Sequence, residues 1–178
     1  MASSQATKDG PIVNKIQQSK KLVTLDLQEY FDETPIAELD LKNFLYEELI
    51  LKEENYRQAL EEHDWEQYQD KYLAVFCSTD AIISKWAYML VAQYAVPFVK
   101  DVFKGDTSVV RDELYRRSLE NIDWKEYEDK FVILKGCSDS EKPVPESAYL
   151  YATKKLVPHV KKLMYGEACS NVPVYRQR

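Results

Sequence analysis

Three cysteines, each close to an acidic residue, are the side chains of this 178-residue sequence that point most directly to chemistry. Two of them sit in related strings, "DKYLAVFCSTD" and "DKFVILKGCSD", and the third lies in "YGEACSNVP". Thiolates and carboxylates are ligands for zinc and iron, and thiolates also hold iron–sulfur species. The predicted metal ligands are Cys77, Cys137, Cys169, Asp80, Asp139 and Glu167.

The same thiols allow a second chemistry. A cysteine near the start of a helix can be a reactive thiolate, so Cys77 or Cys137 could serve as the nucleophile of a thiol-dependent enzyme. Asp80 and Asp139 disfavour a thiolate beside them, and no histidine is close in the sequence to act as a base. A third interpretation is that the small thiols only fill space at the ends of strands.

Several other classes of site are not indicated. The four glycines form neither of the glycine-rich phosphate motifs, and a net charge of −6 with only short basic stretches argues against a nucleic-acid-binding protein. The longest uncharged run, residues 86–99, has 14 residues and is too short to span a bilayer. Residues 1–10 lack an apolar segment, so no signal peptide is expected. We therefore expect a cytoplasmic protein with reduced thiols.

An internal repeat organises the elements that must position the cysteines. The string "YRQALEEHDWEQYQDKY" (56–72) aligns without a gap on "YRRSLENIDWKEYEDKF" (115–131), with nine identical residues in 17. Residues 86–106 align in the same way on residues 147–167. The repeated units extend over about 52–106 and 111–167, which predicts a duplication inside one domain.

Each unit predicts the same order of elements. Charged helices are expected over 51–62 and 109–121, followed by apolar strands over 72–76 and 131–134. Helices then begin at Ser84 and Pro145 and are ended by Pro97 and Pro158. Short strands follow over 101–103 and 162–165. At the N-terminal end, residues 22–27 and 35–51 suggest two or three more strands, for which an antiparallel arrangement is open.

This order predicts an α/β fold in which internally duplicated strand-helix units form a mainly parallel, mixed sheet flanked by helices. A single domain is expected over residues 16–178, after a disordered tail over 1–15. Because the carboxyl ends of parallel strands meet at one edge of a sheet, all three thiols are expected there.

The remaining notable side chains have structural interpretations. Trp65 and Trp124 occupy matching positions and are predicted to pack a helix end onto the sheet. Arg57 and Arg116 are expected to pair with nearby acids. The two histidines, His63 and His159, are expected to be hydrogen-bonded or exposed rather than metal ligands. The apolar surface of the uncharged helix at 86–99 is expected to be buried by another element. This element is either the N-terminal segment or a second copy in a homodimer.

Long strings of the sequence resemble one known family. "DLKNFLYEELILKEENYRQAL", "CSTDAIISKWAYMLVA", "PVPESAY" and "YGEACSNVPVY" are similar to the bacterial family called domain of unknown function 2480, over about residues 12–175. The family has no established activity. The resemblance implies short cytosolic proteins and, as possible partners, the components that assemble iron–sulfur clusters.

Three functional hypotheses follow from the sequence. The first is an accessory protein that binds zinc or iron, or assists iron–sulfur assembly, through its cysteines. The second is a thiol-dependent enzyme. The third is a non-catalytic interaction module that forms a homodimer or docks a partner, with the uncharged helix as its contact surface.

Overall fold

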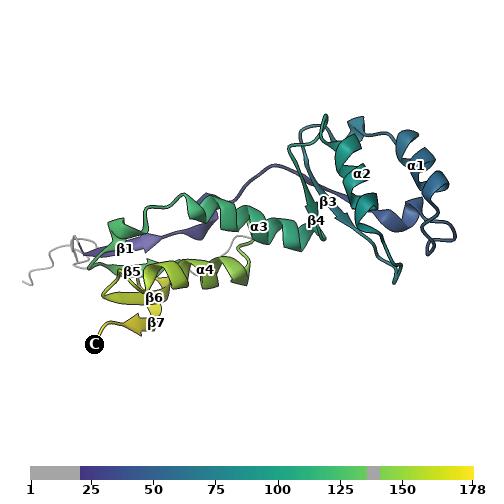
Figure 1. Cartoon of the computed structure of the whole chain (residues 1–178). Helices are drawn as coiled ribbons and strands as arrows, with labels where there is room; N and C mark the ends of the chain where they lie inside the picture. The colour runs from purple at the N-terminus through teal and green to yellow at the C-terminus, as the bar shows by residue number, and fades with distance from the viewer. Residues whose placement is uncertain (1–20, 136–140) are drawn as a thin grey trace, which may run out of the picture.

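The computed structural model describes residues 21–135 and 141–178. The chain forms two lobes, each built on its own sheet, and one long helix, α3 (Thr107–Glu120), runs between them and gives the molecule an elongated shape (Figure 1). Within the described residues, no helix has the length and apolar character needed to cross a membrane. The tail predicted over residues 1–15, Cys137 and Asp139 lie outside the described residues.

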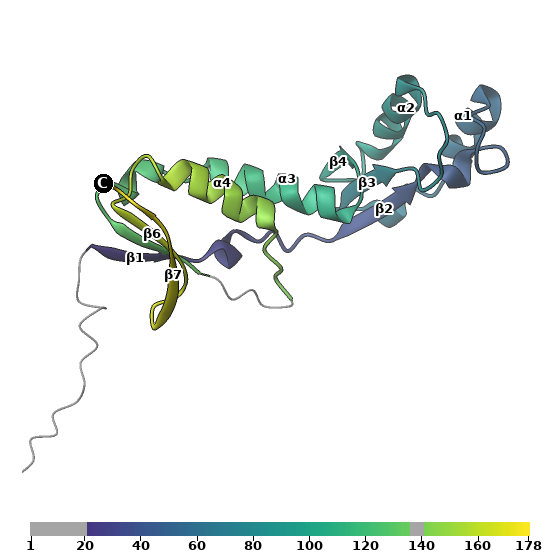
Figure 2. The ribbon, with the colours of Figure 1, turned by 90° about the horizontal axis from the view of Figure 1, so that it is seen from below.

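Lobe 1 contains the four-stranded sheet, in the order β1-β5-β6-β7. Its strands are β1 (Leu22–Leu25), β5 (Phe131–Leu134), β6 (Lys162–Glu167) and β7 (Ser170–Arg176). The first three strands are parallel, and β7 returns antiparallel to β6. Helix α4 (Glu146–Leu156) and the C-terminal half of α3 cover one face of this sheet (Figure 2).

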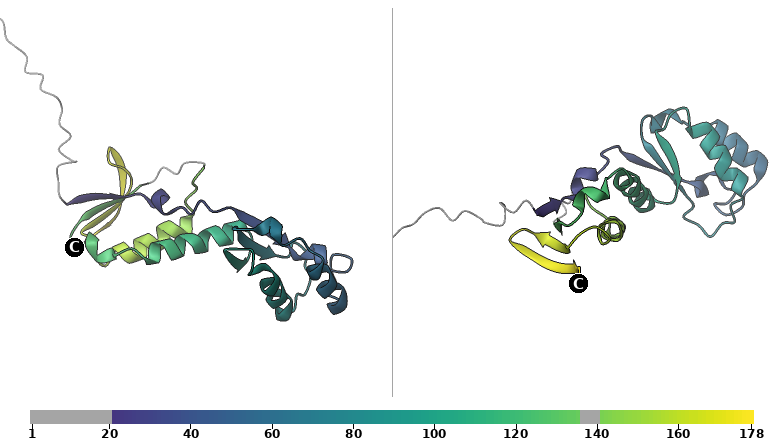
Figure 3. Two further views of the ribbon diagram at one scale, coloured as in Figure 1. Left: turned by 90° about the horizontal axis from the view of Figure 1, so that it is seen from above. Right: turned by 60° about the vertical axis from the view of Figure 1, so that its left-hand side comes forward.

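Lobe 2 contains the three-stranded, fully parallel sheet, in the order β2-β3-β4. Its strands are β2 (Ile36–Asp40), β3 (Tyr72–Phe76) and β4 (Asp101–Lys104), and its helices are α1 (Glu53–Glu61) and α2 (Lys85–Ala95). Both helices lie on one face of the sheet, and the N-terminal half of α3 lies on the other (Figure 3).

Helix α3 belongs to both lobes because it carries two apolar surfaces. Val110 and Leu114, one turn apart, are buried against the three-stranded sheet. Tyr115 and Leu119, also one turn apart, are buried in the core of lobe 1. Asp106 caps the helix, since its carboxylate accepts from the backbone N–H groups of residues 108 and 109. The two lobes are therefore joined by a shared, packed helix.

Short polar motifs set the local geometry in both lobes. The sequence Leu-Asp-Leu ends both β1 and β2, and the aspartates, Asp26 and Asp40, accept hydrogen bonds from the backbone two residues further on. Each thereby starts a 3-10 turn, Leu27–Tyr30 in lobe 1 and Leu41–Phe44 in lobe 2. The leucines that follow the aspartates are fully buried, which fixes these turns onto the two cores.

Most of the elements predicted from the sequence are confirmed. The α/β class is observed, and β3 and β5 have the predicted bounds. Helices α2 and α4 end at Ala95 and Leu156, just before Pro97 and Pro158. Trp65 and Trp124 are buried at the turns that lead into β3 and β5, in the predicted structural role.

Three features of the fold differ from the prediction. The strands form two sheets rather than one, because β2 pairs with β3 and β1 pairs with β5. Residues 35–51 form a single strand, parallel to its neighbour, before a 3-10 turn. Strand β7 is absent from the predicted elements. It contains Pro173, and proline is tolerated there because β7 is the edge strand. The duplication itself stays a prediction.

The uncharged helix expected at 86–99 is partly covered within lobe 2. Ala87, Val91 and Ala95 of α2 share a core with Tyr56 and Leu60 of α1. Leu41 and Leu45, from the segment before α1, pack into that core too. The choice between the two predicted covers stays a prediction. Met89 and Val96 remain exposed on the outer side of α2.

Candidate functional site

The predicted cysteine site divides between the two lobes. Cys77 follows β3 in lobe 2, whereas Cys169 is exposed in the hairpin between β6 and β7 in lobe 1, and the two lobes lie at opposite ends of the molecule (Figures 1 and 3). Asp80 follows Cys77, and Glu167 is the last residue of β6. The strand ends do not meet at one edge, because they belong to two sheets.

No described part of the chain brings three histidine, cysteine or acidic side chains together as a metal site. Cys77 lies instead with its sulfur 3.3 Å from the Thr79 hydroxyl. It lines a cavity of about 690 Å³ at the carboxyl edge of the three-stranded sheet, beside Tyr88 and Lys104. Burial, and to a lesser degree the nearby Cys77, raise the pKa of the Tyr88 hydroxyl. Cys77 thus has neither a histidine nor a second thiol beside it among the residues that line this cavity.

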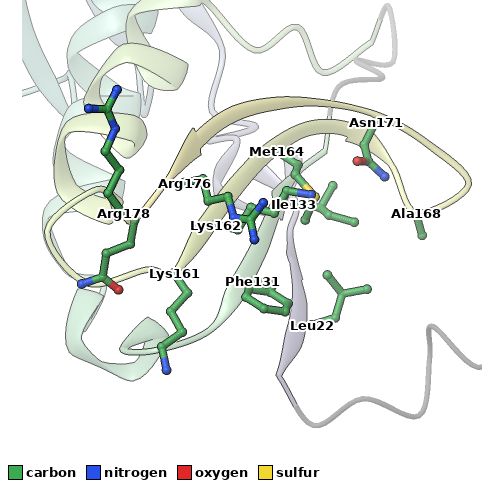
Figure 4. A pocket seen from close by; sticks show the side chains of 11 residues that line it. Leu22, Phe131, Ile133, Lys161, Lys162, Met164, Ala168, Asn171, Arg176 and Arg178 are labelled. Carbon is green, nitrogen blue, oxygen red and sulfur yellow. The ribbon is translucent and has the colours of Figure 1, made fainter.

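The most distinctive surface lies on lobe 1, on the sheet face opposite α3 and α4. It encloses a cavity of about 670 Å³ (Figure 4). We call this surface the basic sheet face. Its lining side chains used below are Leu22, Phe131, Ile133, Met164, Lys161, Lys162, Arg176 and Arg178.

Strand register explains how these side chains come together. Leu22, Phe131, Lys162 and Arg176 stand in one row across β1, β5, β6 and β7, because each is the register partner of the next. Side chains two residues apart on a strand share a face, so Ile133 and its partner Met164 continue the same surface. The intervening residues point to the core beneath α3 and α4.

The centre of the basic sheet face is apolar and its border is cationic. Ile133 and Met164 are buried at the bottom, and Phe131 is 38% exposed above them. Lys162 and Arg176 lie next to each other on β6 and β7, and Lys161 and Arg178 extend the positive border (Figure 4). None of the described side chains that line this cavity is acidic.

The arginines show that this positive charge is unusual for the molecule. The four arginines elsewhere all have oxygen partners: Arg57 binds Glu53, Arg111 binds the carbonyl of Asp32, Arg116 binds Glu113, and Arg117 binds Asp101. The first and third of these pairs confirm the ion pairs predicted from the sequence. Arg176 and Arg178 form no ion pair with any described residue, and neither does Lys162. At the rim, the ammonium of Lys161 is 3.2 Å from Asp129.

Comparison with known proteins identifies the family. The family model described as "Protein of unknown function (DUF2480)" matches residues 10–177, nearly the whole chain. The chain belongs to this family. The search of curated proteins gives no match, and the search of solved structures gives none either. The function of this DUF2480 protein has to be argued from its own geometry.

The basic sheet face of this DUF2480 protein places cationic side chains beside apolar ones, an arrangement that can bind an anionic group. Its described lining side chains are basic, apolar or amide groups, with no cysteine, histidine or side-chain carboxylate among them. Sequence reasoning missed it because its residues come from four strands whose order was unknown. The available signals were the basic pair "KK" at 161–162 and "RQR" at 176–178, which looked like ordinary surface charge.

Proposed function

We propose that this protein is a non-catalytic interaction module whose basic sheet face binds an acidic segment of a partner protein. The observation that carries the proposal is the contrast among the arginines. On a protein of net charge −6, Arg176 and Arg178 lie beside an apolar surface and form neither an ion pair nor a side-chain hydrogen bond with a described residue, whereas each of the other four arginines binds an oxygen.

Charge and apolar area act together in such an interface. Arg176 and Lys162 can form charge-assisted hydrogen bonds with carboxylates, and Arg offers two parallel donors to one carboxylate. Phe131 and Leu22 contribute apolar contact beside them, and contact of this kind strengthens the ion pairs by excluding water. Opposite net charges of the two surfaces also speed their encounter.

Metal binding and iron–sulfur assembly remain predictions of the sequence and its family resemblance. Two of the six predicted ligands, Cys137 and Asp139, lie outside the described residues, and the four others divide between two lobes. The thiol-dependent enzyme also remains a prediction. The interaction module differs from both because it needs neither cysteine chemistry nor a metal.

The proposal can be tested with poly-L-glutamate as the acidic probe. The full-length, 15N-labelled protein is titrated at low salt, and backbone amide shifts are followed by NMR. We expect shifts concentrated at Leu22, Phe131, Lys162 and Arg176, and we expect them to weaken as salt is raised.

Two matched variants locate the binding. Arg176→Glu should abolish the shifts, whereas Lys154→Glu, which changes an exposed lysine on α4, should leave them unchanged. Shifts spread over the lysines of both lobes, or equal binding by the two variants, would overturn the proposal. Tighter binding of duplex DNA than of poly-L-glutamate at the same face would overturn it too, because the partner would then be a nucleic acid.

A further inference from the structure

The two sheets can be compared position by position, because their strands pair in matching registers. In lobe 1, Leu22 pairs with Phe131, and Phe131 with Lys162. In lobe 2, Ile36 pairs with Tyr72, and Tyr72 with Asp101.

The next row shows the same correspondence. Ile133 pairs with Met164 in lobe 1, and Ala74 pairs with Phe103 in lobe 2. The basic sheet face therefore corresponds to one particular face of the three-stranded sheet.

In lobe 2 that face is covered by a helix of the same chain. Val110 and Leu114 of α3 pack against Ala74 and Phe103. One turn further on, the guanidinium of Arg117 lies 2.6 Å from the carboxylate of Asp101 and 4.8 Å from the ring centroid of Phe103. The covering helix thus uses apolar residues at i and i+4 and a charged residue at i+7, all on one side.

In lobe 1 no helix formed by the described residues lies on the corresponding face (Figure 2). Helix α3 passes to the opposite face there, through Tyr115 and Leu119. The position of Asp101 is occupied by Lys162, with Arg176 beside it on β7. Lobe 1 therefore keeps the apolar residues of both rows. Where lobe 2 has an acidic residue that contacts the covering helix, lobe 1 has a basic one.

We propose that the basic sheet face takes an amphipathic helix of a partner protein, with apolar residues at i and i+4 and a carboxylate at i+7. The inference rests on the proposed function and names the partner's chemistry. The helix lies across the sheet as α3 lies across the other one, and its carboxylate reaches Lys162 and Arg176. Its apolar residues contact Leu22 and Phe131, because Met164 beneath them is already buried.

Other occupants fit the face less well. The acidic helix α1 of a second copy offers no exposed apolar pair, because Tyr56 and Leu60 are buried in its own lobe. Residues 1–20 carry three lysines against one aspartate, so their charge has the same sign as the face. A separate acidic helix has neither disadvantage.

The test uses two fluorescently labelled, alanine-based helical peptides of equal composition. One has leucines at i and i+4 and glutamate at i+7, and the other has the same residues in scrambled order. Anisotropy titrations with the full-length protein should show at least tenfold tighter binding of the patterned peptide. Its circular dichroism should show increased helicity when it is bound.

A charge exchange makes the test specific. The variant Lys162→Asp gives lobe 1 the residue that lobe 2 has at position 101. It should lose at least tenfold in affinity for the glutamate peptide and prefer a peptide with arginine at i+7. The control Lys154→Asp, on the opposite side of lobe 1, should keep the wild-type preference. Lys162→Gln, which removes the charge only, should bind both patterned peptides alike.

The outcomes separate this inference from the proposed function. If the patterned and scrambled peptides bind equally and poly-L-glutamate still binds at the face, the proposal of a helical partner is overturned. The proposal of an acidic partner then still holds. Failure of all the acidic probes overturns both. A peptide bound in extended form along β7 also overturns the helix. Light scattering that shows a dimer displaced by no peptide identifies a second copy as the occupant.

Discussion

Lobe 1 and lobe 2 share a backbone design down to single unusual residues. Gly105 and Gly166 have φ values of +138° and +124° and end the parallel part of β4 and β6 in the same way. Asp70 and Asp129 both have φ near +60°, and the backbone N–H of each donates to a carbonyl after the following helix, at 2.9 Å. Both lobes therefore contain the same two unusual backbone features at these positions.

The two lobes differ in whether the buried polar groups of their cores have hydrogen-bond partners. In lobe 2 the hydroxyl of Tyr56 donates to the carbonyl of Ala87, and the indole of Trp65 donates to the carbonyl of Leu60. At the corresponding positions of lobe 1, the buried hydroxyl of Tyr115 and the indole N–H of Trp124 find no partner among the described residues. Helices lie on both faces of the sheet of lobe 2, whereas no helix formed by the described residues lies on the basic sheet face of lobe 1. The two lobes therefore have similar backbone geometry, and differences in their side chains place the candidate site on lobe 1.

The largest expected effect concerns the shared helix. Leu60→Ala and Leu119→Ala remove corresponding, fully buried side chains from lobe 2 and lobe 1, and each should lower the free energy of unfolding by about 2–5 kcal/mol. Because α3 packs in both cores, we expect each variant to unfold in one transition. Urea titration followed by circular dichroism and by tryptophan fluorescence measures this.

Single-tryptophan versions of the protein provide the control. With Trp86 and one of the other two tryptophans replaced by phenylalanine, Trp65 reports on lobe 2 and Trp124 on lobe 1. Coincident midpoints in each variant support one cooperative domain, as predicted over residues 16–178. Two separated midpoints would show that the lobes unfold independently and that α3 couples them weakly.

How far sequence reasoning reached depends on whether a feature is local. The strand at 131–134 and the end of the helix before Pro158 depend on residues that are close in the sequence, so both could be predicted. The division into two sheets could not, because it depends on β1 pairing with β5, more than a hundred residues away. The cysteine cluster was inferred from a single sheet and lost its geometric basis when Cys77 and Cys169 proved to lie in different lobes. The basic sheet face needed the same long-range register.

The next largest expected effect is the loss of stability when alanine replaces each of the two glycines with positive φ. A Cβ added at Gly166 would lie 2.5 Å from the backbone oxygen of Ser170, whereas one added at Gly105 would meet the side chain of Val109 at 2.7 Å. Both positions have positive φ, so alanine costs about 1–3 kcal/mol at each. Gly166→Ala should cost more, since its new Cβ makes the shorter contact, 2.5 Å from a backbone oxygen that the hairpin holds in place.

Thermal unfolding of the two variants measures this difference. Gly166→Ala should also weaken binding at the basic sheet face, because Gly166 begins the hairpin that positions Arg176. The double variant Gly105→Ala with Val109→Gly is the control, since it removes the Val109 Cβ that the new Cβ would meet at 2.7 Å and should regain part of the lost stability. If Gly105→Ala lowers the stability more than Gly166→Ala does and weakens peptide binding equally, the hairpin does not have the proposed role of positioning Arg176.

A smaller effect should distinguish the two buried tyrosines. Tyr56→Phe removes a hydroxyl that donates to a carbonyl at 3.2 Å and should cost about 1 kcal/mol. Tyr115→Phe removes a buried hydroxyl without a partner among the described residues, so stability should stay the same or rise slightly. Burial raises the pKa of Tyr115 to about 12, which keeps the hydroxyl neutral over the range of the assay. Chemical denaturation at neutral pH compares them, and a larger loss from Tyr115→Phe would reverse the ranking of the two lobes.

The smallest effect is a pH dependence confined to lobe 2. His63 lies among aromatic rings, 4.9 Å from Trp65 between ring centroids, and its Nε2 is 2.9 Å from the Tyr68 hydroxyl. Burial lowers the pKa of His63 below its ordinary value of 6.5. As the pH falls through 6.5, the unfolded chain gains a proton at this residue that the folded chain does not, so the free energy of unfolding decreases.

Lobe 1 has no such dependence at the matching position, which is Ile122. His63→Ile should therefore flatten the stability profile between pH 7.5 and pH 5, and carboxylates that titrate lower should dominate what remains. Among these is Glu113, whose pKa is lowered to about 2, chiefly by its hydrogen bond from Arg116. An NMR titration of the His63 ring gives the direct measurement. A midpoint at or above 6.5, or an unchanged profile in His63→Ile, would mean that the aromatic cluster of lobe 2 does not exclude the charged ring.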